Sequence, residues 1–193
     1  GYRMLFGHRP HTLKPGQNVL VWGASGGLGS MAVQLIATAG GNAIGVISDT
    51  HGRIPSGVPN AFKGVDLIIH AGDIGEEAVL DKLSKIAPVA AVRGNMDFGK
   101  WTRRLPETEV IEIGQIVLYV LHIANRLDAD PDKTGFKAVI SGHTHRPDVY
   151  EKNGVTFINP GSASYPKLGR PGSAALIHIT GAKLSVEFIR LKG

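Results

Sequence analysis

The chain has 193 residues and a mass of 20.4 kDa, with 42% hydrophobic residues, 19% charged residues and a mean hydropathy of +0.03. This composition is typical of a soluble globular protein and excludes both a disordered chain and one built on a long apolar membrane span. The sequence contains no cysteine, so a bound metal must be held by His, Asp, Glu or Asn. The first thirty residues lack the pattern of a signal peptide, and we expect a cytoplasmic protein that does not associate with membranes.

The formal charge of +5 has an uneven source along the chain. Residues 1–48 contain Arg3, Arg9 and Lys14 but no acid, whereas the remainder is nearly balanced. No run of Lys and Arg with interleaved aromatic residues is present, so we do not expect nucleic acid as a partner.

Apolar runs of strand length alternate with helical patterns through the first half of the chain. We expect helices at 30–39, near Asn60 and at 76–86, and strands at 18–22, 43–48, 66–70 and 89–92. Such alternation predicts an α/β fold with a largely parallel sheet in this part of the chain.

After Trp101 the pattern changes to successive strands. These are expected at 109–113, 116–121, 138–141, 149–151, 155–159, 174–179 and 184–191. The short turns Asn153-Gly154 and Gly181-Ala182 favour antiparallel hairpins. Two sheets packed face to face, with helices outside, would accommodate both halves.

Five of the predicted strands end in residues that can bind a metal. The candidates are Asp49, His51, Asp73, Asn95, His122, His143 and His145. In open α/β sheets, ligands bind beyond the carboxyl ends of the strands, so these side chains should converge on one rim. A catalytic zinc uses about three protein ligands. Seven candidates instead suit two divalent ions roughly 3.5–4 Å apart, bridged by a carboxylate.

The order of these motifs resembles the calcineurin-like metallophosphoesterases. The motifs are DTHG at 49–52, AGD at 71–73, GNMD at 94–97, the lone His122 and GHTH at 142–145. With NPGS at 159–162, the chain is similar to the YfcE-like group of small bacterial and archaeal phosphodiesterases. The likeness covers about residues 44–193 and implies a four-layer α/β/β/α sandwich.

The resemblance also implies roles for the candidate residues. Asp49, His51 and His145 would hold one metal, Asn95, His122 and His143 the other, and Asp73 would bridge them. The shared water, activated by both ions, would attack a small phosphodiester. Ligands without sulfur admit Mn, Fe, Zn, Co, Ni or Mg, and the resemblance favours manganese.

The third motif departs from many relatives, because Met96 stands where they carry a histidine thought to act as a general acid. We therefore expect good leaving groups, or protonation by solvent or by Asp97. Asn95 and Asp97 are the predicted catalytic residues, Asn95 because its amide can contact both metal and phosphate.

Simpler interpretations exist for single residues. Asp73 and Asn95 could each cap a helix or a turn, and His70 within its apolar run is more typical of a packed strand histidine than of a ligand. Arg93 could steer an anionic substrate or pair with a surface acid. A non-catalytic scaffold on the same fold is the alternative function, although retention of the histidines argues against it.

Residues 17–48 predict a strand, a glycine-rich turn, a helix and a second strand, which is how a dinucleotide-binding unit begins. The turn carries Gly23, Gly26 and Gly29, the candidate cofactor-binding residues, in GxxGxxG spacing. With residues 2–16 the segment resembles the cofactor domain of medium-chain crotonyl-CoA carboxylase/reductases, over about residues 1–49.

The two resemblances overlap on residues 44–49. We predict a chimera with a Rossmann-like N-terminal fragment at 1–43 and a metallophosphoesterase domain at 44–193. Asp49 is assigned to the metal, and NADP is not expected, although dinucleotide binding at the glycine turn is a second alternative. The strand at 44–48 should have neighbours on both sides, so the strand at 19–22 must pair elsewhere or with a second chain. A homodimer with chain exchange is one such arrangement.

Overall fold

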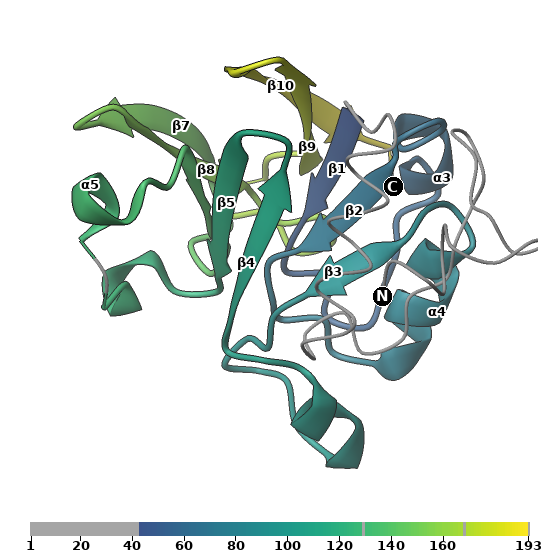
Figure 1. The fold of residues 1–193 in the computed structure, drawn as a ribbon. Helices are drawn as coiled ribbons and strands as arrows, with labels where there is room; N and C mark the ends of the chain where they lie inside the picture. The colour runs from purple at the N-terminus through teal and green to yellow at the C-terminus, as the bar shows by residue number, and fades with distance from the viewer. Residues whose placement is uncertain (1–42, 129, 168, 193) are drawn as a thin grey trace, which may run out of the picture.

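The computed structural model describes residues 43–192 except positions 129 and 168 (Figure 1). The expected strand at 18–22, the expected helix at 30–39 and the glycines Gly23, Gly26 and Gly29 lie outside the described residues. The described part has the predicted α/β fold, with two mixed five-stranded sheets.

The first sheet has the strand order β10-β9-β1-β2-β3. Its strands are β1 (Ala43–Ile47), β2 (Leu67–His70), β3 (Val89–Ala91), β9 (Gly172–Thr180) and β10 (Lys183–Leu191). The predicted parallel arrangement is confirmed for β1, β2 and β3. Strand β9 adds antiparallel to β1 from the far end of the chain, so β1 has hydrogen-bonded neighbours on both sides, as expected.

The second sheet has the order β4-β5-β6-β8-β7. Its strands are β4 (Thr108–Ile113), β5 (Ile116–Leu121), β6 (Ala138–Ile140), β7 (Pro147–Lys152) and β8 (Val155–Pro160). Hairpins join β4 to β5 and β7 to β8, but β5, β6 and β8 are parallel. The predicted turn at Asn153 and Gly154 joins β7 to β8, with φ angles of 53° and 77° that suit a tight hairpin.

Successive side chains of a strand point to opposite faces of its sheet, and this alternation explains how the sheets and helices pack in layers. Ile44 and Val46 of β1 point into the core between the sheets, against Leu118 and Val120 of β5, whereas Ile47 points outward. The outward face of the first sheet is covered by α3 (Val58–Ala61) and α4 (Glu77–Ser84). Both helices fall inside the predicted helical segments.

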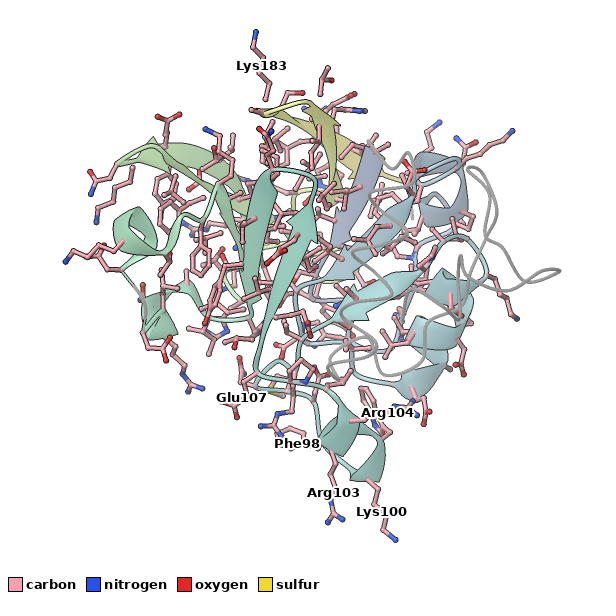
Figure 2. The ribbon with its side chains drawn as sticks, viewed as in Figure 1. Phe98, Lys100, Arg103, Arg104, Glu107 and Lys183 are labelled. Atoms are coloured by element: carbon pink, nitrogen blue, oxygen red, sulfur yellow. The ribbon has the colours of Figure 1, made fainter. Side chains whose placement is uncertain are left out.

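The fourth layer is thin. The segment after β5 contributes η2 (Ala124–Arg126) and α5 (Pro131–Thr134) on the outer side of the second sheet (Figure 1). Leu127 and Phe136 of this segment pack on the outward-facing Tyr119 and Val139. The sequence did not predict these short helices, nor η1 (Lys100–Arg104), from which Lys100 and Arg103 extend in Figure 2.

Across the part of the chain that the structure describes, no helix has the length and apolar character needed to cross a bilayer.

Candidate metal centre

The loops that follow β1 and β2 run side by side beyond the end of the first sheet. The Asp49 amide donates to the Gly72 carbonyl at 3.0 Å, and the His51 amide donates to the Asp73 carbonyl at 3.0 Å. The parallel pairing of the two strands is thereby extended by their loops, which places DTHG and AGD next to each other.

The second sheet contributes two more loops to the same place. The amide of His143 donates to Asp49 Oδ2 at 3.1 Å, and the Gly142 amide donates to the His122 carbonyl at 3.0 Å. These bonds tie the ends of β5 and β6 to the end of β1. The rim predicted from the sequence therefore lies where both sheets meet.

Five of the seven predicted ligands have a left-handed backbone. The φ angles are 53° for Asp49, 44° for His51, 54° for Asp73, 69° for His143 and 59° for His145. A non-glycine residue in this conformation costs roughly 1–2 kcal/mol. Strain of this kind clusters at functional sites and persists only where the surroundings enforce it. The surrounding structure thus holds these loops in a conformation that brings the ligand atoms of the five residues together in the two clusters described below.

The ligand atoms of Asp49, His51 and His145 form the first cluster, in which all lie within 4.8 Å of one another. Asp49 Oδ1 is 3.2 Å from His145 Nε2, and the Nε2 atoms of the two histidines are 3.4 Å apart. Asp49 is fully buried. This set is the one that the resemblance implied for the first metal.

A second cluster contains Asp73, His122 and His143, again with ligand atoms within 4.8 Å. His122 Nε2 lies 3.3 Å from Asp73 Oδ2, and the rings of the two histidines meet edge to face with centroids 5.3 Å apart. Asp73 and His122 are buried, whereas His143 is exposed. The open side of the second cluster is therefore at His143.

Two of the histidines are held in the tautomer that metal binding requires. His122 Nδ1 lies 2.7 Å from the Ala71 carbonyl oxygen, and His145 Nδ1 lies 2.6 Å from that of Tyr165. A carbonyl can only accept, so each Nδ1 carries the proton and each neutral ring keeps its Nε2 lone pair for the cluster. Metal-binding histidines commonly use the other ring nitrogen in this way.

Two buried atoms at the rim have no hydrogen-bond partner, Asp49 Oδ1 and His122 Nε2. Their neighbours at 3.2 and 3.3 Å are misaligned for hydrogen bonding. Two atoms that each lie about 2.1 Å from one ion at tetrahedral or octahedral angles are about 3.0–3.4 Å apart. The unpaired atoms and their spacing thus fit divalent metal ions.

The carboxylates differ in their electrostatics. Burial raises the pKa of Asp49, because its ionised form loses hydration there. Burial also acts to raise the pKa of Asp73, but the His122 ring and the Met96 amide outweigh it and hold this pKa below the ordinary value. A nearby positive charge would therefore favour the ionised form of Asp49, which burial disfavours.

The GNMD loop packs directly on Asp73. The Met96 amide donates to Asp73 Oδ1 at 2.8 Å, and a Cβ on Gly94 would lie 2.1 Å from the Asp73 amide nitrogen, so only glycine fits there. Asn95, between them, is exposed. The loop therefore places Asn95 beside Asp73, on the solvent side.

Asp97 is buried, and both of its oxygens already accept hydrogen bonds. The Gly75 amide donates to Oδ1 and the Gly94 amide to Oδ2, each at 2.8 Å. These bonds join the loop that carries Asp73 to the loop that carries Asn95. The contacts suit a residue that positions the site better than one that delivers a proton.

Several supporting residues were not identified from the sequence. Asn159 Nδ2 donates to the Gly142 carbonyl at 2.7 Å and to Thr144 Oγ1 at 3.1 Å, which fixes the GHTH turn. Ser162 Oγ donates to the Asp49 carbonyl at 2.9 Å. Both belong to the NPGS motif, so the signal was present in the sequence, but the partners required the fold.

The structure shows the contacts of Arg93 and His70, whose roles the sequence left open. Arg93 forms an ion pair with Glu107. His70 is fully buried, as expected for a packed strand histidine, and its Nε2 lies 2.9 Å from Thr50 Oγ1. Burial, followed by repulsion from His122, lowers the pKa of His70 to about 3.

A short stretch of the chain has relatives of a different kind. A 52-residue stretch is 81% identical to crotonyl-CoA carboxylase/reductase of Cereibacter sphaeroides, a match that spans 27% of this chain and 12% of that relative.

Most of the chain matches phosphoesterases. A probable metallophosphoesterase of Methanothermobacter thermautotrophicus is 40% identical over 158 residues, covering 76% of this chain and 91% of the relative. The solved structure of zinc-complexed Vps29 from Entamoeba histolytica superposes with a TM-score of 0.63 at 26% identity, over 77% of this chain and 98% of that one. An archaeal phosphodiesterase shares the fold, with a TM-score of 0.61 at 22% identity over 76% and 99% of the two chains. The sequence profile of the calcineurin-like phosphoesterase superfamily domain matches residues 43–182. The chain therefore belongs to the calcineurin-like phosphoesterase superfamily, and this membership together with the two clusters supports a metal-dependent phosphoesterase.

Proposed function

We propose that this chain is a phosphodiesterase that uses two divalent metal ions. The proposed ligands of one ion are Asp49, His51 and His145; those of the other are Asn95, His122 and His143, with Asp73 shared between the two. The observation that carries the proposal is the meeting of two three-residue clusters whose buried atoms Asp49 Oδ1 and His122 Nε2 lack other partners.

Oxygen and imidazole ligands without sulfur accept Mn, Fe, Zn, Co, Ni or Mg, and we propose manganese. When bound, such a pair of ions lowers the pKa of a water between them and neutralises charge on the phosphate. The chain itself supplies the geometry, since the Ala71 and Tyr165 carbonyls orient the rings of His122 and His145.

The exposed amide of Asn95 is proposed to contact the substrate, because its nitrogen can donate to a phosphate oxygen while its oxygen faces a cation. Met96 offers no proton at the neighbouring position. With both oxygens of Asp97 accepting backbone hydrogen bonds, solvent is the better candidate for protonating the leaving group.

Hydrolysis of bis(p-nitrophenyl) phosphate tests the function. We expect turnover that requires metal, is abolished by EDTA and is restored by Mn²⁺, together with two bound ions per chain by inductively coupled plasma mass spectrometry. Absence of metal-dependent turnover would favour the non-catalytic scaffold instead.

We also propose that the chain is a chimera divided near residue 43. The 81% identity to the reductase over 52 residues supports this division, as does the complete set of phosphoesterase motifs beyond it. Because β9 and β2 occupy both sides of β1, no further strand can pair there. A cytoplasmic location and a homodimer with chain exchange remain predictions from the sequence.

Dinucleotide binding at Gly23, Gly26 and Gly29 is the competing function of the N-terminal segment. Titration of NADPH against the fluorescence of Trp22, with Trp22→Phe as the control, measures it directly. We expect no saturable change, and a micromolar response that disappears in the control would revise the proposal.

A further inference from the structure

A cavity of about 640 Å³ opens beside the exposed His143, on the outer side of the second sheet. It is lined by the ends of β7 and β8, by Asn125 of η2 and by residues between β8 and β9. Ligand pockets for small organic molecules have volumes of about 300–1,000 Å³. The space is thus large enough for the organic part of a substrate whose phosphate lies at the clusters.

One wall of this cavity is aromatic. Tyr150 of β7 and Phe157 of β8 are cross-strand partners, and their rings stack with centroids 5.0 Å apart and planes 2° from parallel. Both residues line the cavity, and Tyr150 keeps 49% of its surface exposed. The exposed ring of Tyr150, stacked on the partly buried ring of Phe157, is a surface on which a nucleobase stacks favourably.

The cavity is also cationic. Arg146, Lys167 and Arg170 line it, against a single acid, Asp148. Among the residues that the structure describes, none of these three cations has an ion-pair partner. The cavity should therefore bind most tightly a ligand that carries a second anionic group, in addition to the phosphate that lies at the metal clusters.

We infer that the cavity binds a nucleotide unit of the substrate, with the base on the Tyr150–Phe157 pair and a second phosphate held by Arg146, Lys167 and Arg170. This inference rests on the proposed function, since it identifies the substrate class of that same site. The unit could belong to a small dinucleotide or to the end of a single strand, which present the same chemistry.

Binding is measured first, without turnover. Isothermal titration calorimetry in EDTA compares thymidine 3′,5′-bisphosphate, thymidine 5′-monophosphate and pyrophosphate. We expect both thymidine nucleotides to bind at least about tenfold more tightly than pyrophosphate, and their affinity to decrease with salt, because the cations are solvent-exposed. Equal affinity for pyrophosphate would overturn the inference, since the base would then contribute nothing.

Single substitutions in the cavity test which side chains contact the base and which contact the second phosphate. Tyr150→Ala should weaken bisphosphate binding roughly tenfold, and Tyr150→Phe should restore it, because stacking on an aromatic ring needs no hydroxyl. Arg146→Ala and Arg170→Ala should each weaken it by about threefold to tenfold. The matched controls are Phe188→Ala on β10 and Lys183→Ala at the β9–β10 turn (Figure 2), an exposed aromatic residue and an exposed cation outside the cavity. Equal losses in variants and controls would refute the assignment.

Turnover separates this inference from the proposed function. Metal-dependent hydrolysis of methyl p-nitrophenyl phosphate reports on the metal centre, and the p-nitrophenyl ester of thymidine 3′,5′-bisphosphate reports on the cavity as well. We expect the ratio of their kcat/KM values to favour the nucleotide and to fall in Tyr150→Ala. Hydrolysis of the methyl ester with no preference for the nucleotide would refute the cavity assignment alone. Stronger inhibition by oligothymidylate would identify the end of a single strand as the source of the nucleotide unit, and stronger inhibition by thymidine 3′,5′-bisphosphate would identify a small nucleotide. Inhibition by neither would refute the cavity assignment.

Discussion

His145 Nδ1 lies 2.6 Å from the Tyr165 carbonyl oxygen, while Nε2 of the same ring lies 3.2 Å from Asp49 Oδ1. One nitrogen of this imidazole is thus fixed by the backbone and the other faces a buried carboxylate. The arrangement makes His145 a direct test of the first metal site.

Replacing His145 with alanine should remove one of the two proposed ions. We expect bound metal to fall from two ions per chain toward one. Activity should fall at least about 100-fold, since loss of only a supporting partner already costs about 10–100-fold. Elemental analysis and bis(p-nitrophenyl) phosphate turnover measure both effects. His178→Ala on β9, a half-exposed histidine facing Glu187, is the matched control. Two ions retained in His145→Ala would contradict the ligand assignment.

Asp97 should behave as a positioning residue. Asp97→Ala leaves the Gly75 and Gly94 amides without acceptors, and we expect a loss of about 2–4 kcal/mol in unfolding free energy. Asp97→Asn keeps one acceptor oxygen and should lower activity on good and poor leaving groups by the same factor. A general acid would instead matter more for poor leaving groups. If Asp97→Asn lost activity only on esters of alkyl alcohols, which are poor leaving groups, Asp97 would instead be the proton donor.

His70 should make the protein sensitive to acid. Its pKa is lowered to about 3 in the folded protein, from 6.5 in the unfolded chain, so between these values the unfolded chain binds more protons. The stabilising contribution is complete above pH 6.5 and is lost as the pH falls toward 3, at up to about 1.4 kcal/mol per pH unit. His70→Gln can still donate to Thr50 but does not titrate. Denaturant unfolding in EDTA between pH 4.5 and 7.5 should give the variant a shallower slope, and equal slopes would count against a buried neutral His70.

Gly142 should not tolerate a side chain. A Cβ there would lie 1.9 Å from Ser48 Oγ and 2.9 Å from Asp49 Oδ2, so Gly142→Ala must displace the loop that carries Asp49. We expect reduced metal affinity and a lower melting temperature. Gly64→Ala is the control, because an added Cβ there has nothing within 4 Å, although Gly64, unlike Gly142, has a positive φ of 81°. Its cost should be limited to about 1–2 kcal/mol of backbone strain. Equal metal binding in the two variants would show that the close approach at Gly142 is unimportant.

The strands could be located from the sequence because their apolar runs are long and bounded by turns. The predicted strand 116–121 coincides with β5, and most other bounds differ by one or two residues. The order of strands was harder to obtain. The pairing of β9 with β1 joins residues more than 120 positions apart, as in Val46 with Ala175, and no local pattern encodes it.

The candidate ligands were found from their positions after strands, and the structure brings six of them into two clusters. Their support could not be found in this way. Asn159 and Ser162 belong to the NPGS motif, but their partners are the backbone carbonyls of Gly142 and Asp49, which no spacing in the chain identifies. The short helices η2 and α5 were missed because three or four residues carry no amphipathic period.

The left-handed φ angles at the rim have a consequence for how this domain changes over time. Glycine adopts φ near +50° without penalty, so replacing Asp73 or His143 by glycine would relieve the backbone while discarding a ligand. A copy of the domain freed from selection for catalysis would gain stability by such replacements. A related sequence with glycine at either position is therefore expected to have lost hydrolytic activity while keeping the fold for another function.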